Sequence, residues 1–428
     1  MKKVIVISYF FPPSAKAGAH RAYSMAEYLP RFGWQPVFIA PRNGYYGRVP
    51  RFDNALLRMV GQFPVYSIPF YYPFNNQSSN FLARGARRLW ETALIPDGKV
   101  FWNRAIKKRL KQIVTEHNPC VFFITSTPFS SFLLAPYLKK EFGLPVVLDY
   151  RDPWAGNPSL EHNRLKERLC LIFEKKALAA ADLVATASYH MINFIRKTLG
   201  QITDDKQFFG FPYGYNGEFF KKKILPISLK NSCEKVTGTF AGFVHGDINS
   251  EIILEGIKLA ITKEKAVEKK LRVECYGTLF GHFKEPKVLI NKYELDQNVT
   301  IHPFLTYSNF LQVLRKSSFL ILPLGDSPIA RVLYPTKFFD YLGVKRPILY
   351  IGGQGQVAET IKDCNAGLCA RPEPSGIAES LTAILQNTDP ETWYTAEAEY
   401  EKLDRMPIFR DFCNRLDELS SQVVNKIG

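Results

Sequence analysis

The segment 334–343, with the sequence YPTKFFDYLG, is predicted to begin a helix that carries a cation and a carboxylate. Lys337 and Asp340 are three residues apart, so they would be neighbours on one side of that helix. The free amides of its first turn, around Thr336, suit a pyrophosphate together with the cation of Lys337. Asp340, one turn further on, could accept hydrogen bonds from the hydroxyls of a ribose. The alternative is an ordinary amphipathic helix in which Lys337 and Asp340 only pair with each other.

A second candidate group follows the first predicted strand, in the Gly- and Ala-rich loop 14–20. Gly18 would let the backbone approach a ligand closely. His20 could donate to a leaving phosphate, or it could be an exposed histidine at the start of a helix. Arg21 could bind a phosphate, or it could pair with a carboxylate. The loop has no G-x-G-x-x-G pattern, so a dinucleotide site is not indicated.

A third group, DYRDPW at 149–154, leaves another buried strand. Arg151 and Asp152 would face a ligand there or form a structural ion pair. Asp152 is the candidate for positioning the hydroxyl of an acceptor, provided that it lies within hydrogen-bond reach of that group. The chain contains no Asp-x-Asp pair of the kind that holds a divalent ion on a diphosphate. No metal and no cofactor are therefore expected, and cations and helix amides would have to balance the phosphate charge.

The elements that must position these residues alternate between apolar runs and helical periodicity, which predicts parallel α/β structure. Expected strands in the first half are 4–9, 37–40, 121–125, 146–149 and 183–187, and those in the second half are 239–243, 271–276, 299–302, 319–324 and 348–351. Helices are expected between them. Two Rossmann-like, doubly wound domains facing across a cleft follow from this pattern, with ligands at the carboxyl ends of the strands.

The length of 428 residues fits this organisation. We expect an N-terminal domain at 1–222, a C-terminal domain at 223–390 and closing helices at 391–428 that pack back toward the first domain. The polar, Lys-rich stretch within 221–235 is the expected linker.

Several segments, taken in order, resemble family 4-like glycosyltransferases of the GT-B fold, in particular a group that acts in surface-polysaccharide assembly. The first is SYFFPP with GAHRAYSMAEYLPRFGWQPVFIAP; the later ones are TSTPFSS, LDYRDPW, FEKKALAAADLVATAS with FPYGYNGEFF, GTFAGFV, ECYGTL and YPTKFFDYLG with KRPIL. The resemblance covers most of residues 1–385. It implies a nucleotide-sugar donor bound by the C-terminal domain and an acceptor bound by the N-terminal domain.

The resemblance also assigns donor-side roles. The acidic residue at the Asp340 position holds the ribose hydroxyls and is usually Glu. A second Glu, eight positions earlier, is commonly assigned to the donor sugar, but here that position is Val332. Neither an Arg nor a Lys occupies the loop 244–247, where the phosphate-binding pair usually follows the first strand. The phosphate charge would then rest on Lys337 and Arg331.

Two further roles come from the matching segments. Phe304, in the strand exit HPFLT, would pack near the base of the nucleotide, unless this is an ordinary strand exit. Ser126, Arg151 and Arg21 are the expected acceptor-binding residues, and Asp152, His20 and Lys337 the expected catalytic ones.

The charge is strongly basic, with 56 Lys and Arg against 40 Asp and Glu, or +16 in total. Basic residues and aromatic residues are interleaved within 63–111, which we interpret as an insertion of the N-terminal domain. Such a surface suits an anionic membrane. The alternatives are nucleic-acid backbone binding, or aromatic side chains that pack inward beneath a solvated basic face. No nucleic-acid-binding motif occurs, so no nucleic acid is expected as a partner.

These observations favour a metal-independent glycosyltransferase that moves a sugar from a nucleoside-diphosphate sugar, UDP by default, to a glycan or lipid-linked acceptor. The resemblance implies retention of anomeric configuration. A nucleotide-sugar epimerase and a non-catalytic binding protein on a transferase scaffold remain alternatives. Seven cysteines without a C-x-x-C pattern favour a cytoplasmic setting. No run of about 18 apolar residues is present, so any membrane association would be peripheral, on the inner face.

Overall fold

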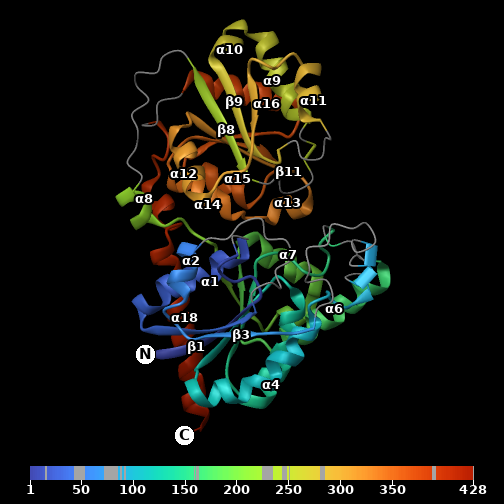
Figure 1. Cartoon of the computed structure of the whole chain (residues 1–428), viewed down its shortest axis with the longest axis vertical. Coiled ribbons are helices and arrows are strands. Elements are labelled where there is room, and N and C mark those ends of the chain that lie inside the picture. Colours follow the sequence, from blue (N-terminus) through green and yellow to red (C-terminus); the bar gives the residue numbers. More distant parts are fainter. Residues whose placement is uncertain are drawn as a thin grey trace. The chain divides into compact units, whose positions relative to one another are not determined.

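The computed structural model describes residues 1–14, 17–42, 54–71, 85–86, 89–90, 93–158, 160, 163–223, 235–242, 248–249, 251–279, 285–387 and 392–427. The chain divides into two compact units, one made of Met1–Pro212 with Met406–Gly428 and the other of Tyr213–Arg405. Each unit contains its own parallel sheet with helices around it (Figure 1).

The first unit is built on a seven-stranded parallel sheet in the order β3-β2-β1-β4-β5-β6-β7. Its strands are β1 (Lys2–Ser8), β2 (Trp34–Pro41), β3 (Val65–Ile68), β4 (Val121–Thr125), β5 (Val146–Tyr150), β6 (Leu183–Thr186) and β7 (Gln207–Gly210). The five predicted strands are confirmed. They are buried almost throughout because helices cover both faces of a parallel sheet.

The helices of the first unit, apart from the last one, lie between its strands along the chain. They are α1 (Ala17–Tyr28), α2 (Asn54–Val60), α4 (Val100–His117), α5 (Ala135–Phe142), α6 (Arg164–Ala179), α7 (Tyr189–Leu199) and α18 (Arg405–Ile427), with 3₁₀ turns at Leu29–Phe32, Phe129–Leu134 and Gly200–Thr203. Gly33 ends the first of these 3₁₀ turns in the left-handed region, with φ 81°.

Helix α4 corrects one expectation. It was expected to be part of an insertion, but it is the crossover from β3 to β4 and buries Trp102, Ile106 and Leu110. The residues 72–84, 87–88 and 91–92 of the same predicted insertion lie outside the described residues.

The last helix, α18, belongs to the first unit. Phe412 stacks on Phe211 with ring centroids 4.1 Å apart, and Phe409 stacks on Tyr28 at 5.1 Å. Near the other end of the helix, Asp417 accepts from the Nζ of Lys2 at 2.8 Å. Figure 1 shows this red helix running beside the blue and green elements of the first sheet.

The second unit has a six-stranded parallel sheet in the order β10-β9-β8-β11-β12-β13. Its strands are β8 (Val236–Gly242), β9 (Leu271–Gly277), β10 (Val299–His302), β11 (Phe319–Gly325), β12 (Ile348–Gly352) and β13 (Gly367–Ala370). Its helices are α8 (Gly217–Lys223), α9 (Glu251–Lys263), α10 (Lys265–Lys270), α11 (Pro286–Lys292), α12 (Tyr307–Lys316), α13 (Pro328–Val332), α14 (Thr336–Gly343), α15 (Gln356–Asp363), α16 (Pro374–Gln386) and α17 (Glu397–Glu401).

The boundary between the units lies at Pro212, before the residue 222 that the sequence suggests. Residues after Pro212 are held by the second unit: Tyr215 stacks on Tyr400 at 4.5 Å, and Arg405 donates to the carbonyls of Tyr213 and Gly214. The polar composition of the predicted linker gives no sign of these aromatic contacts.

Candidate functional site

In the second unit, the helix α14 follows strand β11 and the short helix α13. Phe338, Phe339 and Leu342 are buried on its inner side. Lys337 and Asp340 are only partly buried on another side, as their spacing predicts. The helix begins at Thr336, and Pro335 is its N-cap.

Lys337 lies over an aromatic ring. Its Nζ is 4.6 Å from the ring centroid of Phe240, a buried residue of β8. Removal from water disfavours the ammonium, and burial lowers the pKa of Lys337 to about 7. A nearby anion such as a diphosphate would favour the charged form of the lysine. Binding of a phosphate group and protonation of Lys337 would therefore be coupled.

The partner that the structure gives Asp340 is Tyr307, at the start of α12. The hydroxyl of Tyr307 donates to Oδ1 of Asp340 at 2.8 Å. Burial raises the pKa of Asp340 to about 6, while the bond from Tyr307 and the charge of Arg405 oppose that rise. Asp340 thus combines a carboxylate with a hydroxyl partner in the position where the sequence predicts a ribose.

The end of β10 carries the aromatic residue expected near a base. Phe304 is 37% exposed, which leaves part of its ring available for contact. Gly277 ends the neighbouring strand β9 with φ 117°, and a Cβ there would come within 2.9 Å of the Phe304 ring. His302 stacks on Tyr276, with centroids 4.4 Å apart, and contacts Glu274.

Arg331 and Val332 close the short helix α13. The Nε of Arg331 lies 2.9 Å from Oδ1 of Asp326, in an exposed ion pair that raises the pKa of Arg331. An exposed pair of this kind contributes little stability, so a phosphate could replace Asp326 at low cost. Val332 is buried, and no acidic side chain stands at its position. The loop 244–247 lies outside the described residues.

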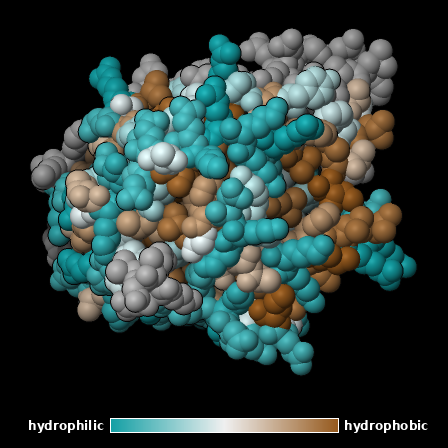
Figure 2. All heavy atoms as spheres, turned by 90° about the horizontal axis from the view of Figure 1, so that it is seen from below, coloured by the Kyte–Doolittle hydropathy of each residue, from teal (hydrophilic) through white to brown (hydrophobic). Residues whose placement is uncertain are grey.

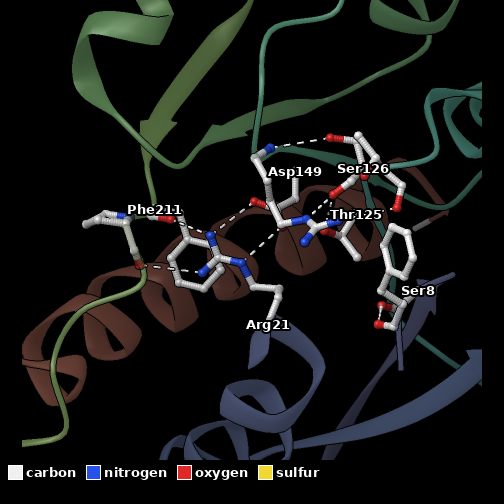
Figure 3. Close-up of polar contacts among 10 residues, drawn as sticks. Ser8, Arg21, Thr125, Ser126, Asp149 and Phe211 are labelled. Atoms are coloured by element: carbon white, nitrogen blue, oxygen red, sulfur yellow. Dashed lines mark hydrogen bonds and ion pairs between the residues drawn. The ribbon is translucent and has the colours of Figure 1, made fainter. Parts of the chain in front are cut away.

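In the first unit, Arg21 does not have the ligand-binding role considered for it. Its Nε is 3.0 Å from Oδ2 of Asp149, and both side chains are fully buried. Its Nη2 donates to the carbonyl of Phe211 at 2.6 Å and its Nη1 to that of Pro212 at 3.5 Å. Figure 3 shows Arg21 pointing toward Asp149 and Phe211. Arg21 therefore takes the alternative role of pairing with a carboxylate, and we correct its assignment to the acceptor.

Ser126 holds the backbone and side chain of Arg151. Its hydroxyl accepts from the amide of Arg151 at 3.3 Å, and its carbonyl accepts from the Arg151 Nε (Figure 3). The carbonyl of Thr127 accepts from Nη2 at 3.3 Å. Ser126 is fully buried, so it positions Arg151 and does not itself reach an acceptor, contrary to the expectation.

Gly18, near the start of α1, lies close to the side chain of Arg151. A Cβ at Gly18 would collide with Nη1 of Arg151 and come within 2.7 Å of the Cβ of Phe10. The glycine is therefore required for the close approach of α1 to Arg151, within the small-residue loop that the sequence singles out.

Asp152 and His20 flank the same strand ends and are both partly buried. Burial raises the pKa of Asp152, and the neighbouring charge of Arg151 opposes the shift. A carboxylate with a raised pKa is a better proton acceptor than an exposed one. These two side chains retain the exposure that a catalytic group needs.

Two residues were missed by the sequence reasoning. Tyr307 lies 33 positions from its partner Asp340, and no spacing rule connects them. Glu174 of α6 is buried, accepts from the amide of Ala155 at 2.7 Å, and has its pKa raised to about 7 by burial. Its helical spacing alone suggested only an ordinary charged position.

Comparisons with known proteins show what the chain is similar to. The glycosyl transferase 4-like domain matches residues 17–206, which span most of the first unit and include its candidate site. No curated protein matches the chain in a sequence search.

Solved structures resemble the whole chain and not only this domain. Sucrose-phosphate synthase from Thermosynechococcus elongatus is 12% identical, with a TM-score of 0.64, and the match covers 99% of this chain and 100% of that one. A glycosyltransferase from Rickettsia africae is 14% identical, with a TM-score of 0.63 and 98% of each chain covered. HepE from Anabaena, in complex with UDP, is 13% identical, with a TM-score of 0.63, covering 98% and 100%.

At these identities the likeness shows the fold: the chain has the α/β GT-B fold, as its resemblance implies. The glycosyl transferase 4-like domain and this fold together support a glycosyltransferase. Among the described residues, no helix has the length and apolar character needed to cross a membrane. Within the same ranges, no three His, Cys, Asp or Glu side chains are grouped so as to hold a metal ion.

Proposed function

We propose that this glycosyltransferase takes its sugar from a nucleoside-diphosphate sugar, with UDP as the favoured nucleotide. The observation that carries the proposal is the placement of Lys337 and Asp340 on α14, at the carboxyl edge of the second sheet, where doubly wound folds bind nucleotides. The structures of HepE, described as complexes with UDP and with UDP-glucose, support the choice of nucleotide.

Each donor contact has a distinct task. Lys337 and the amides around Thr336 would bind the diphosphate and stabilise the charge that develops as it leaves. Arg331 would exchange Asp326 for a phosphate oxygen. Asp340 would accept from the ribose hydroxyls, and Phe304 would pack beside the base.

The acceptor contacts are proposed in the first unit. Arg151, held by Ser126 and Thr127, would contact the acceptor, and Asp152 would orient the reacting hydroxyl. His20 would donate to the leaving phosphate. The proposed acceptor is a glycan or a lipid-linked molecule of surface-polysaccharide assembly. The proposed transfer retains the configuration at the anomeric carbon. A lipid-linked acceptor would keep the enzyme at an anionic membrane surface.

One observation favours a second candidate. Val332 is buried and apolar where a Glu for the donor sugar is usual in the family that the chain resembles. A non-catalytic protein that binds nucleotide sugars would tolerate this change. An epimerase is also compatible with a bound nucleotide sugar, but it would need no acceptor.

A panel of nucleotide sugars, screened by thermal shift and followed by product analysis, separates these functions. A transferase releases nucleoside diphosphate faster when an acceptor is added, and the anomeric NMR signal of the product reports retention or inversion. An epimerase produces an isomeric nucleotide sugar without an acceptor, and a binding protein produces neither. Repeating the assay with EDTA tests metal independence, for which full activity is expected because Lys337 and helix amides balance the charge.

A further inference from the structure

A groove on the first unit lies between the residues that follow β3 and the outer side of α4. Its volume is about 440 Å³, and its lining comprises Ile68, Pro69, Phe70, Tyr71, Phe101, Arg104, Ala105, Lys108 and Arg109. The floor is thus apolar, and the rim contributed by α4 is cationic.

The floor of the groove consists of side chains that are buried and packed against neighbouring aromatic rings. Ile68 and Phe70 are buried, and the ring of Phe70 packs edge-on against Tyr9 with centroids 6.2 Å apart. Tyr9 also packs against Trp102 of α4 at 5.5 Å. Tyr9, which directly follows β1, therefore packs the floor of the groove and α4 against the sheet.

The rim concentrates charge of one sign. Arg104, Lys108 and Arg109 are all exposed, and Arg104 and Lys108 are four residues apart on the helix. Like charges at that spacing repel each other, and α4 has only Glu116 as an acidic residue. An anion in the groove would relieve this repulsion.

Two of the side chains that line the groove, Tyr71 and Phe101, are apolar and exposed, and further exposed apolar side chains occur elsewhere on the first unit. Tyr71 is 70% exposed, and Leu89 and Phe101 are exposed as well. Leu165 and Ile172 project from α6, which packs against the same 3₁₀ turn, Phe129–Leu134, as α4 does. Figure 2 shows brown side chains gathered toward the edge of the lower face where α6 lies, with teal ones beside them.

We propose that this groove docks the protein on an anionic lipid bilayer, with a phospholipid phosphate between Arg104, Lys108 and Arg109 and its acyl chain along the apolar floor. This inference gives a defined site to the membrane association named in the proposed function. It rests on the proposed function only for that membrane partner, because docking itself requires no sugar transfer. Cations with exposed aromatic and aliphatic residues match a bilayer interface. A nucleic-acid backbone would use the cations alone and leave the exposed Tyr71 and Phe101 of the groove without a role.

The groove lies at the carboxyl edge of the first sheet. Strands β1 and β3 belong to one parallel sheet, so Tyr9 and the residues after Ile68 stand at the same edge. That edge also carries Asp152, the candidate for orienting the acceptor hydroxyl. A protein docked through the groove would therefore keep this edge close to lipid-linked molecules.

The test is co-sedimentation of the full chain with vesicles, without any nucleotide sugar. The wild-type protein should bind phosphatidylglycerol-containing vesicles and bind pure phosphatidylcholine at least tenfold more weakly. Arg104→Glu with Lys108→Glu should weaken binding at least about thirtyfold, since each basic residue near such a surface contributes about 1 kcal/mol. Phe101→Ser with Tyr71→Ser should remove the binding that persists at high salt.

The matched control is Lys107→Glu with Lys111→Glu, which makes the same charge change on the same helix. Neither residue lines the groove, and the Nζ of Lys107 lies over the ring of Tyr137 at 4.7 Å. This control should lose less than threefold, with melting temperatures of all variants within a few degrees of wild type. Equal losses in both charge variants, equal binding to both lipids, or binding to an RNA homopolymer in preference to vesicles would overturn the proposal.

Transfer to a water-soluble acceptor mimic separates this failure from that of the proposed function. The groove variants should retain wild-type transfer in that assay. If the protein binds the vesicles but never transfers sugar, the docking proposal stands and the proposed function is wrong. If it transfers sugar but does not bind the vesicles, only the docking proposal is wrong.

Discussion

The hydroxyl of Tyr307 donates to Oδ1 of Asp340 at 2.8 Å, so one oxygen of the proposed ribose-binding carboxylate is already engaged. Tyr307 begins α12, and Asp340 lies one turn inside α14. A ribose hydroxyl would therefore use another lone pair of the carboxylate or replace the tyrosine. In the structure without nucleotide, the bond from Tyr307 orients Asp340, which makes Tyr307 a positioning residue of the proposed donor site.

Asp340→Ala should weaken the binding of UDP by about ten- to a hundredfold, the range for a hydrogen bond to a charged group. Because a ribose contact is present in substrate and transition state alike, turnover at saturating donor should change less. Calorimetric titration of UDP measures the first effect and steady-state kinetics the second. Unchanged affinity in a variant with wild-type melting temperature would show that Asp340 does not bind the nucleotide.

Tyr307→Phe should shift the pH dependence of UDP binding. The pKa of Asp340 is about 6, so affinity should fall as the pH drops through that value and the carboxylate becomes protonated. The bond from Tyr307 lowers this pKa, and its removal should move the acid limb of the profile upward. Tyr293→Phe, which removes a hydroxyl bonded to Glu251 and Glu255, is the control and should leave the profile in place.

Lys337→Ala should reduce turnover by about a hundredfold or more, because losing one preorganised donor to developing charge costs roughly 2.7–4 kcal/mol. The pKa of Lys337 is about 7, so part of the lysine is neutral at pH 7.5 before the diphosphate binds. Binding should then take up a proton, which calorimetry in buffers of different ionisation enthalpy detects. A wild-type protein that binds UDP without this proton uptake would contradict the assignment.

Arg21→Met should lower the free energy of unfolding by roughly 3–5 kcal/mol, since it leaves Asp149 charged and buried without its partner. The carbonyls of Phe211 and Pro212 also lose their donor. Urea denaturation measures the loss, and Arg104→Met on the exposed side of α4 is the control, with a change within about 0.5 kcal/mol. Equal stability of the two variants would mean that the buried pair is not structural.

The sequence predicts the fold well wherever a strand is an uninterrupted apolar run. Strands β4 and β10 have the predicted bounds, while β3, β7 and β13 were missed. These three are four-residue edge strands with mixed burial. Their short length and partial exposure leave no periodicity strong enough to identify them.

The site was predictable only where its residues share one helix. Lys337 and Asp340 follow from their spacing on α14. The pair of Arg21 with Asp149 spans 128 positions, and that of Tyr307 with Asp340 joins two helices, so both depend on tertiary packing. The sequence offered two roles for Arg21, and only the packing of α1 against β5 and Phe211 decides between them.

The return of α18 to the first unit has a consequence for biosynthesis. The second unit is one continuous stretch, Tyr213–Arg405, inserted into a first unit that is split in the sequence. A ribosome therefore delivers every residue of the second unit before it delivers Phe409 and Phe412, which cover Tyr28 and Phe211. The first unit, although it emerges earlier, must wait with these aromatic surfaces uncovered until the last helix is released.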